Sequence, residues 1–538
     1  MTSTVLTVRK TLMGAISRLL SLQPGSALRN TAVGAIAVMA IGLFGRVLSY
    51  PVQDDENIHI ATALLLSDHH IYRDLGFVHL PNLPLMLNAV FSLSGTDHYV
   101  LAGRLLVCLA WVGAAAALGL IAWQKTKSPA VVATAIILLM TNTLLLGPAG
   151  MLVTNNLLPI TVSLFGLYFF IRGMEEYRGR PWLFFLSGLC ISVAIGLKVN
   201  NIFLVPPFAA AAFLAPAGQP FGARLKHAVL PMIAGGLVGG LPALYYLAQD
   251  PDGFLAHTLR YFTYAHHDYW QTLDEPKVMG MAGKLQIAEQ MWLGGATLLA
   301  ACLALYQFFV PLSSRERPEG HVAAGWLFWL TIGLIALGAA VSFIPTPAFS
   351  QYFTPPVAFV IVLVIVTHAG LDERERRLAL PLMAAVVALS MVAGASRLVP
   401  GIPAFFMPHK WTGIVVHDNA RAALGQIGGT AAPRVATLWP IYALEGGGTI
   451  YPEFAAGPFV YRIADHIPAA DRRHFRTTSA SRLPAFLDAD PPQAIIVKNN
   501  GRSDGELRDY AIANGYRPVP LDRSGELSVL VRPDSGKK

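Results

Sequence analysis

The stretch "SYPVQDDENIHIATALLLSDHHIYRDLGFVHLPNLPLM" (residues 49–86) lies between two long apolar segments, at about residues 31–50 and 98–123. It carries five carboxylates and four histidines, although only 13% of the whole chain is charged and 54% is hydrophobic. Soluble proteins contain about 25% charged residues, and the mean hydropathy here is +0.50. The chain is therefore predicted to be a multi-span membrane protein with a polar loop directly after its first span.

Apolar segments recur along the chain as far as residue 399. Each is long enough, straight or tilted, to take a helix across a hydrocarbon core about 30 Å thick. We expect eleven spans, at about 31–50, 98–123, 128–147, 153–172, 182–197, 201–216, 228–248, 289–312, 322–345, 353–370 and 380–399.

Basic residues are distributed unequally between the two sets of connecting loops. The N-terminal segment and every second loop after it together carry 16 Lys and Arg residues, whereas the short loops between them carry 5. Because Lys and Arg beside a span are retained on the cytoplasmic side, the N-terminus is predicted to be cytoplasmic. An odd number of spans then places both the acidic loop and the C-terminal region outside the cytoplasm.

The chain divides into three predicted regions. Residues 1–30 are expected to form a cytoplasmic amphipathic helix, and residues 31–400 the membrane region, with outer loops at 51–97 and 249–288. In residues 401–538, strand-like runs such as "QAIIVKN" alternate with helix-like runs, which predicts a small extracytoplasmic α/β domain. All three cysteines fall within predicted spans, so we expect no disulfide framework in the outer domain. The face of the N-terminal helix would be formed by Leu12, Ile16, Leu19 and Leu20.

The acids of the first outer loop allow two interpretations. They are either solvated loop residues or a catalytic group, and three features favour the second. "DDE" (residues 54–56) follows the span at once, where reduced solvation raises a carboxylate pKa and suits it to act as a general base. "ENIHIATALLL" continues as a helix predicted to lie in the membrane interface.

The third feature is a set of cations near the same membrane surface. Arg46 either snorkels to the interface or belongs to a site, whereas Arg104 and Lys198 are predicted to contact a lipid phosphate. Two or three cations at headgroup depth form a binding site for such an anion. A carboxylate beside a phosphate site on the outer side suggests group transfer from a lipid phosphate.

The same residues resemble the GT-C glycosyltransferases, in particular the polyprenyl-phosphate-sugar-dependent enzymes related to protein mannosyltransferases and lipid A aminoarabinose transferases. The resemblance rests on the order and spacing of several segments through most of the membrane region, followed by an outer C-terminal domain. These segments are "DDENIHIATALLL", "IYRDLGFVHLPNLPLMLNAVFSLSG", "AGRLL", "GLKVNNIFLVPP" and "SQYFTPPVAFVIVL".

The resemblance implies roles for individual residues. Asp55 matches the catalytic acid, and Glu56 and Asp54 lie beside it. The implied substrate-binding residues are Tyr72, Asp74, His79, Arg104, Asn155, Asn156, Lys198, Gln351 and Tyr352. This chain departs from the pattern at two of these places. Many relatives carry an acid where "TNN" (154–156) stands, and many carry Arg where Gln351 stands, which removes one cation from the phosphate site.

The implied reaction is an inverting displacement at the anomeric carbon of a polyprenyl-phosphate-linked sugar, in a bacterial inner membrane. The acceptor would be an extracytoplasmic glycan, lipid or protein. No nucleotide or required cofactor is expected, because no Gly-rich phosphate loop is present. Nucleic acid is not expected as a partner, because the basic residues are dispersed over the loops.

The second outer loop, at 249–288, leaves two further interpretations open. Its aromatic residues, Tyr261, Tyr264, Tyr269 and Trp270, either anchor the chain at the membrane interface or stack on a sugar. "HHD" (His266, His267, Asp268) has metal-ligand residue types, but adjacent residues rarely converge on one ion, so no metal is assigned.

Two other classes of protein also remain as alternatives. A secondary transporter would place charges near the bilayer midplane in two related halves, and a scaffold would use the outer domain to bind a partner. The outward carboxylates and the absence of an internal repeat favour the glycosyltransferase.

Overall fold

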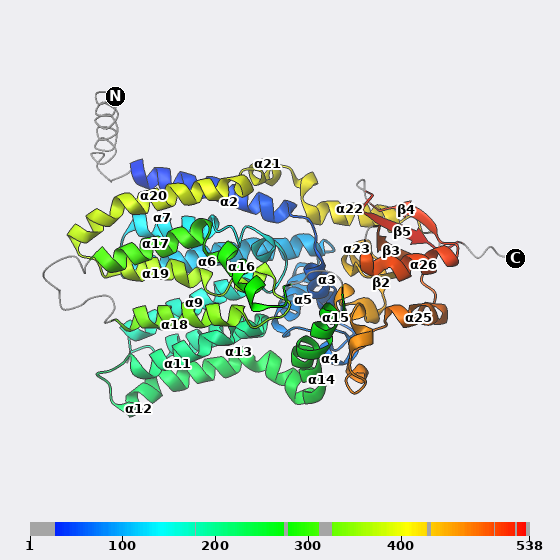
Figure 1. The fold of residues 1–538 in the computed structure, drawn as a ribbon, viewed down its shortest axis with the longest axis horizontal. Helices are drawn as coiled ribbons and strands as arrows, with labels where there is room; N and C mark the ends of the chain where they lie inside the picture. Colours follow the sequence, from blue (N-terminus) through cyan, green and yellow to red (C-terminus); the bar gives the residue numbers. More distant parts are fainter. Residues whose placement is uncertain are drawn as a thin grey trace, which may run out of the picture.

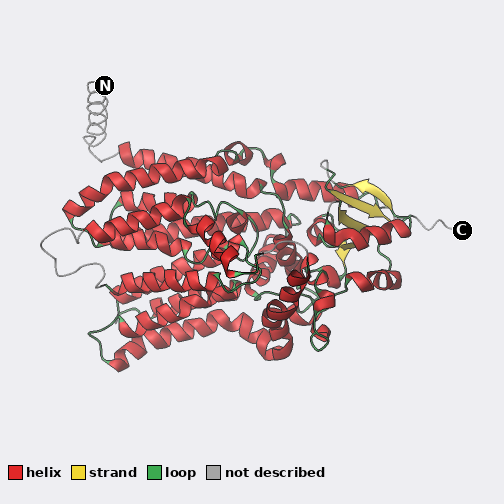
Figure 2. Ribbon diagram, viewed as in Figure 1, coloured by secondary structure: helices red, strands yellow, loops and turns green. Residues whose placement is uncertain are grey.

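The structure is a computed structural model in which a long block of helices carries a small sheet domain at one end (Figure 1). It describes residues 27–177, 179–273, 278–310, 325–427, 432–499, 501–521 and 525–533. The predicted amphipathic face of Leu12, Ile16, Leu19 and Leu20 lies outside these residues. Figure 2 shows that the strands are confined to one end and that the rest is helical.

An apolar helical segment lies at every one of the eleven positions where the sequence predicts a span. These segments are α2 (Ala27–Ser49), α6 (Tyr99–Thr126), α7 (Pro129–Met140), α9 (Leu157–Glu175), α10 (Trp182–Leu197), η1 with α11 (Val199–Leu204, Val205–Leu214), α12 to α13 (Phe221–Arg224, Leu225–Val229, Leu230–Gln249), α17 (Gly295–Phe309), α18 (Trp326–Ser342), η6 with α19 (Ser350–Phe353, Val357–Ala369) and α20 (Glu373–Leu398).

Not all of these helices have full membrane length. Among the described residues, six are long and apolar enough to cross a membrane, and a seventh is obtained if α16 (Met281–Trp292) and α17, bent by 76°, count as one. The other four predicted spans correspond to shorter apolar helices of 10 to 17 residues. The helices run side by side along the long axis of the molecule (Figure 1). This is the architecture of a multi-pass helical membrane protein.

Glycines bring two of the membrane helices into close contact. A Cβ on Gly235 of α13 would lie 1.9 Å from the carbonyl oxygen of Phe185, and one on Gly188 of α10 would lie 1.9 Å from that of Met232. Small residues at such a crossing let two backbones approach within van der Waals contact. The crossing of α10 and α13 therefore admits no larger side chain at these two positions, which holds the end of α10 in place.

Short helices form the loops that were predicted to be outer loops, at the end of the block that faces the sheet domain. They are α3 (Asp54–Leu65), α4 (Ile71–Asp74), α5 (Asn82–Ser94), α8 (Pro148–Met151), α14 (Pro251–Leu255), η3 (Ala256–Ala265) and α15 (His266–Thr272). The prediction of a helix after the first span is confirmed, but the helix does not expose the apolar face that was expected to lie in the membrane interface. Eight consecutive residues of α3, Glu56 to Ala63, are buried, because the helix packs against α5, α6 and the C-terminal domain.

The C-terminal region is a five-stranded sheet with helices packed against it. The strands are β1 (Arg434–Thr437), β2 (Thr449–Ile450), β3 (Ala494–Lys498), β4 (Arg517–Pro520) and β5 (Leu527–Val531), in the order β2-β1-β3-β5-β4. β1 is parallel to β2 and β3, whereas β5 is antiparallel to β3 and β4. The helices are α23 (Pro440–Glu445), α24 (Pro458–Tyr461), α25 (Leu483–Ala489) and α26 (Gly505–Ala513). The predicted α/β domain is confirmed.

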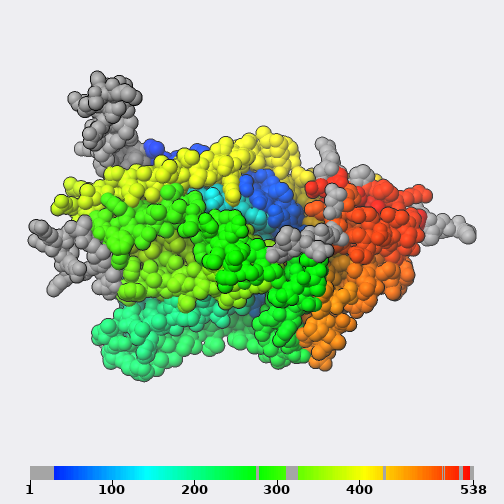
Figure 3. Space-filling model, in the orientation of Figure 1, coloured from blue at the N-terminus to red at the C-terminus, as the bar shows by residue number. Residues whose placement is uncertain are grey.

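The sheet domain packs directly against the outer loops of the membrane region. The chain reaches it through α21 (Gly401–Phe405) and α22 (Thr412–Leu424), which extends from the helical block to the sheet (Figure 1). Ala61 and Leu75 of the first loop belong to the hydrophobic core of this domain. In the space-filling view the domain forms one end of a continuous body (Figure 3). The first outer loop and the C-terminal domain therefore lie on the same side, as the odd number of predicted spans requires.

Candidate active site

The three consecutive acids at the start of α3 point in different directions. Asp54 and Asp55 line a cavity of about 260 Å³ at the end of the helical block next to the sheet domain. Successive residues of a helix are about 100° apart, so a third acid in a row cannot share this direction. Glu56 is fully buried and faces α6. The helix thus offers two carboxylates to the cavity and turns the third into the protein.

Glu56 forms a fully buried ion pair with Arg104. Arg104 Nη2 donates to Glu56 Oε2 at 2.7 Å, and both side chains are 0% exposed. Arg104 Nη1 also donates to the carbonyl oxygens of Val47 and Met151, at 2.8 Å each, and Glu56 Oε1 accepts from the Val153 amide at 2.9 Å. The prediction that Arg104 contacts a lipid phosphate is therefore wrong, because its charge is used to hold α3 against α6. Glu56 likewise lies outside the cavity and has a structural position.

Replacing Glu56 by glutamine is expected to destabilise the protein by about 3 to 5 kcal/mol, because it leaves the buried Arg104 charge without a counter-charge. Thermal unfolding of the purified protein would show this as a lower midpoint. Glu373→Gln is the matched control. Glu373 pairs with Arg377, and because their side chains are 74% and 78% exposed, this ion pair contributes about 0 to 1 kcal/mol. Equal midpoints for the two variants would contradict the structural role of the buried pair.

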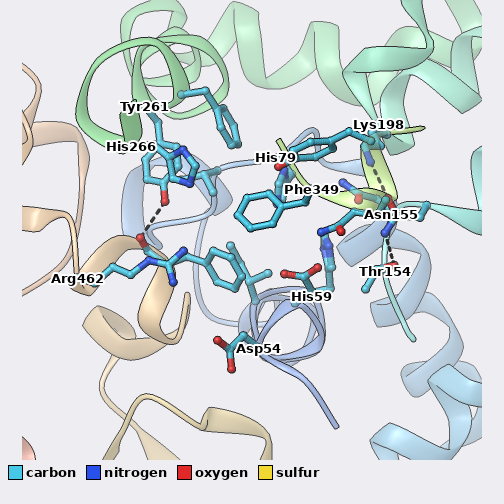
Figure 4. Close-up of a pocket in the computed structure, with 18 of the residues that line it drawn as sticks. Asp54, His59, His79, Thr154, Asn155, Lys198, Tyr261, His266, Phe349 and Arg462 are labelled. Atoms are coloured by element: carbon cyan, nitrogen blue, oxygen red, sulfur yellow. Dashed lines mark hydrogen bonds between the residues drawn. The ribbon is translucent and has the colours of Figure 1, made fainter. Parts of the chain in front are cut away.

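The cavity brings together eight of the twelve predicted site residues, which come from α3, the loop before α5, the segment before α9, the end of α10 and η6. They are Asp54, Asp55, His79, Asn155, Asn156, Lys198, Gln351 and Tyr352. Figure 4 shows Asp54 and His59 on the α3 wall, with Lys198 and Asn155 on another side of the cavity and Arg462 on a third. These side chains are far apart in sequence and meet only through the packing of the helices.

Lys198 is held at the point where α10 ends. It is the C-cap of that helix, in an extended conformation with φ −151° and ψ 119°, and its chain continues as η1. Its Nζ donates to Asn156 Oδ1 at 2.6 Å and lies 5.1 Å from the centre of the Tyr352 ring. Burial lowers the pKa of Lys198 to about 8, while the charge of Asp55 acts in the opposite direction. The ammonium is thus a fixed, partly desolvated cation on the cavity wall.

Asp55 is the carboxylate with the most strongly raised pKa on α3. The pKa of Asp55 is raised to about 6, mainly by burial and also by the neighbouring charge of Asp54, while the charge of Lys198 acts in the opposite direction. The pKa of Asp54 is also raised by burial, and Arg462 opposes that shift. A carboxylate with this pKa is still ionised at neutral pH and is a stronger base than an exposed one. The geometry therefore gives Asp55 the properties of a general base.

Histidines on the same wall are neutral at pH 7. His59 lies one helical turn after Asp55, and its ring stacks on that of His79 with the centroids 5.3 Å apart. Burial lowers the pKa of His79 to about 4 and that of His59 well below 6.5. Neutral imidazoles can donate or accept a hydrogen bond but add no positive charge. The positive charge needed to bind an anion in this cavity must therefore come from other side chains.

Two further predicted site residues lie outside the cavity. The hydroxyl of Tyr72 donates to the backbone oxygen of His79 at 2.7 Å, which holds the His79 loop. Asp74 accepts from the backbone N–H of His70 at 2.8 Å and pairs with the exposed Arg73. Both residues support the loop between α3 and α5, and the structure does not bring either of them to the cavity.

The cavity also contains residues that the sequence did not identify. His59 follows Asp55 by four positions, and this helical spacing could have identified it. Arg462, by contrast, comes from the C-terminal domain, 407 positions after Asp55, and no local pattern links the two. Its guanidinium lies over the rings of Trp270 and Phe459, 4.9 and 5.1 Å from their centres, and its Nε has no hydrogen-bond partner among the residues that the structure describes. The C-terminal domain thus supplies a second cation.

The aromatic loop contributes to the cavity wall only in part. Tyr261 and Trp270 line the cavity, and the Tyr261 hydroxyl donates to the backbone oxygen of Phe459 in the outer domain at 2.8 Å. Tyr264 is 60% exposed and lies outside it. Of the four aromatic residues considered, the rings of Tyr261 and Trp270 therefore form part of the cavity wall.

The "HHD" group does not converge on one point. His266 Nε2 accepts from the Trp270 indole at 2.9 Å, whereas Asp268 contacts His466 of the outer domain at 2.7 Å. Within the described residues, the one group of three or more His, Cys, Asp and Glu side chains close enough to share an ion lies elsewhere.

Comparisons with known proteins agree with this architecture. The family model of dolichyl-phosphate-mannose-protein mannosyltransferases matches residues 78–246. The crystal structure of ArnT from Cupriavidus metallidurans bound to undecaprenyl phosphate superposes with a TM-score of 0.57 at 14% identity, over 94% of this chain and 98% of that chain. Its apo state gives a TM-score of 0.59 at 14% identity, over 95% and 99%. The chain therefore has the same overall fold as ArnT. A sequence comparison with curated proteins gives no match.

The regions covered by the two comparisons differ in which cavity residues they include. The family match begins at Val78 and includes His79, Asn155, Asn156 and Lys198, which are four of the cavity residues. α3 and its two cavity carboxylates precede the matched segment, and Tyr352 and Arg462 follow it. The structural match extends over nearly the whole chain, so the fold likeness includes the C-terminal domain as well as the membrane helices.

Proposed function

We propose that this protein is a bacterial inner-membrane glycosyltransferase that moves a sugar from a polyprenyl phosphate to an extracytoplasmic acceptor. One observation carries the proposal: Asp55, with a pKa of about 6, and the cation Lys198 line the same cavity at the outer end of the apolar helices. A base for an acceptor hydroxyl and a cation for a lipid phosphate are the two groups that this transfer needs. The family and fold likenesses support the same reaction class.

The proposed reaction is a displacement at the anomeric carbon. Asp55 accepts the proton of the acceptor hydroxyl while its oxygen forms the new glycosidic bond. The bond between the anomeric carbon and the phosphate oxygen breaks, and its electron pair leaves with the polyprenyl phosphate. Lys198 stabilises the charge of that leaving group. A positioned base contributes about 10² to 10⁴-fold, and alignment of two substrates can supply about 7 to 11 kcal/mol.

A smaller cavity beside the first is suited to the start of the lipid chain. It has about 130 Å³ and shares six lining residues with the main cavity, namely Val78, His79, Asn155, Lys198, Phe262 and Tyr352. Its other walls are formed by the apolar Leu80, Val199 and Pro345, together with Asn200 and Thr258. Lys198 thus stands where a polar chamber meets an apolar one, which is where the phosphate of a lipid-linked sugar would lie.

Arg462 takes the place of the cation that is missing at position 351. Gln351 lines the cavity but carries no charge, whereas Arg462 faces the same space from the outer domain. With Lys198 it gives the cavity two cations opposite the two carboxylates Asp54 and Asp55. We assign Arg462 to the binding of an anionic group of donor or acceptor.

The direct test is transfer by the purified protein in nanodiscs, with undecaprenyl-phosphate-linked sugars as donors and extracted envelope components as acceptors. Mass spectrometry would identify the sugar and the acceptor from the products. We expect release of free undecaprenyl phosphate in step with product. Absence of transfer from every donor tried, by a folded protein that also fails to bind undecaprenyl phosphate, would contradict the proposal.

The transfer rate is expected to follow a bell-shaped pH profile that falls below about pH 6 and above about pH 8. Below pH 6 Asp55 becomes protonated and loses its capacity as a base, so kcat/KM falls up to tenfold per pH unit. Above pH 8 Lys198 loses its proton and its charge, which weakens phosphate binding. Lys198→Arg should remove the alkaline limb, because Arg stays charged, and leave the acid limb in place. A flat profile between pH 5 and pH 7 would contradict the role of Asp55.

A further inference from the structure

A second cluster of titratable side chains lies away from the cavity, where the loop before α6 meets α22. Asp97 and His98 directly precede α6, and His417 lies within α22. Each of the three residues offers one ligand atom, and these atoms all lie within 4.8 Å of one another. None of the three lines the proposed active site.

His417 is oriented by a buried carboxylate. Its Nδ1 lies 2.9 Å from Glu445 Oε2, and Glu445 is 0% exposed. The other oxygen of Glu445 accepts from the Val100 amide at 2.6 Å, which fixes the carboxylate. A carboxylate at one ring nitrogen selects the tautomer whose other nitrogen has a free lone pair, as in carboxylate–histidine–metal groups. His417 Nε2 is that nitrogen, and it lies 4.0 Å from Asp97 Oδ2.

His98 supplies a second, independent observation. Its ring stacks on His417 with the centroids 3.7 Å apart. Its Nδ1 is buried and has no hydrogen-bond partner within the described part of the chain. A buried polar atom without a partner costs about 1 to 3 kcal/mol unless something binds it. The cluster therefore contains an unsatisfied nitrogen beside an oriented imidazole.

Asp97 already has one cationic neighbour, because Arg421 donates to its Oδ2 at 2.8 Å. A carboxylate has two oxygens and about four acceptor sites, so this bond leaves capacity for a metal ion. Asp97 is 55% exposed at its side chain, and its rotation needs no repacking of the core.

We propose that Asp97, His98 and His417 bind one divalent transition-metal ion, with Glu445 as the positioning residue of His417. Two imidazoles and one carboxylate suit ions of the zinc type rather than calcium or magnesium. In a tetrahedral zinc site the ligand atoms lie about 3.4 Å apart, so the present cluster needs to contract by at most about 1.4 Å. Water would take the fourth position.

The bound ion would join the membrane region to the outer domain. Asp97 and His98 belong to the loop directly before α6, His417 to the connecting helix α22, and Glu445 to α23 of the sheet domain. Three elements from separate parts of the chain would thus be held at one point (Figure 1). The metal has no part in the proposed transfer reaction, so this inference stands independently of it.

The test is titration of the chelator-treated, full-length protein in nanodiscs with ZnCl₂, followed by calorimetry. We expect one equivalent bound by the wild type and a loss of at least tenfold in affinity in His417→Ala and in Asp97→Asn. Glu445→Gln should weaken binding about 10- to 100-fold, as expected for a residue that orients a ligand. His466→Ala is the matched control, because His466 also contacts an aspartate, Asp268, away from this cluster.

Two further measurements make the outcome decisive. Zinc should raise the midpoint of thermal unfolding in the wild type and in His466→Ala, and leave it unchanged in Asp97→Asn, whose exposed side chain can change without loss of folding. X-ray absorption of the zinc-loaded protein should show nitrogen and oxygen ligands without sulfur. The proposal is overturned if the wild type binds no zinc, or if Asp97→Asn and His417→Ala bind it as the wild type does.

Discussion

Replacing Asp55 by asparagine is expected to lower sugar transfer by about 10²-fold or more while donor binding survives. Asparagine keeps the shape of the side chain and can still form hydrogen bonds, but it cannot accept the proton of the acceptor hydroxyl. The comparison is between transfer rates of wild type and variant in nanodiscs, with binding of undecaprenyl phosphate measured in parallel. Because Asp55 stands on a helix packed on several sides, the substitution should leave folding unchanged.

Two other aspartates separate a catalytic effect from a change in charge. Asp68 lies in the same loop and is exposed, so Asp68→Asn should transfer at the wild-type rate. Asp54 lines the cavity and raises the pKa of Asp55, so Asp54→Asn should move the acid limb of the pH profile to lower pH. A well-expressed Asp55→Asn protein that transfers at the wild-type rate would eliminate Asp55 as the base, whatever the fold.

Replacing Lys198 by alanine is expected to weaken donor binding by about 30-fold to several thousand-fold. Removing one partner of a partly buried charge pair costs about 2 to 5 kcal/mol, and 1.4 kcal/mol corresponds to a factor of ten. The loss should appear in the dissociation constant for undecaprenyl phosphate, because the ammonium that the phosphate would contact is gone. Lys198→Arg should retain most of the affinity, since it restores the charge.

Lys125→Ala provides the control for loss of a lysine. Lys125 is at the opposite end of α6 from the cavity, where it pairs with Glu175 on the surface, and its removal should not affect donor binding. Arg462→Ala is expected to weaken binding or transfer as well, in contrast to this control. Wild-type donor affinity in Lys198→Ala would show that the phosphate is bound elsewhere and that Lys198 serves only to hold Asn156 and Tyr352.

Much of the arrangement was accessible from local sequence patterns. Hydropathy located the apolar helices, because a helix that faces lipid must be apolar along its length regardless of its neighbours. Alternation of strand-like and helix-like runs located the sheet domain, although β2 and β4 were too short or too rich in proline to be recognised. The acids directly after the first span drew attention to α3, whose first two carboxylates do line the cavity.

The roles of neighbouring charges depended on the tertiary structure. "DDE" does not show which carboxylates face a cavity, and the answer came from the packing of α3 against α6, where Glu56 meets Arg104. Arg104 looked like a phosphate ligand because a cation near the membrane surface requires a partner, but sequence cannot tell a lipid phosphate from a buried carboxylate.

By itself, the sequence determined the membrane class, the positions of the apolar helices, the C-terminal sheet domain and the acidic first loop. These properties follow from hydropathy and periodicity, which act over one or two helical turns. Only the tertiary structure decided that Asp55 and Lys198 share a cavity, that Glu56 and Arg104 do not belong to it, and that Arg462 does. The physical reason is that such groups interact through space over a few ångströms while they are separated by up to hundreds of residues along the chain.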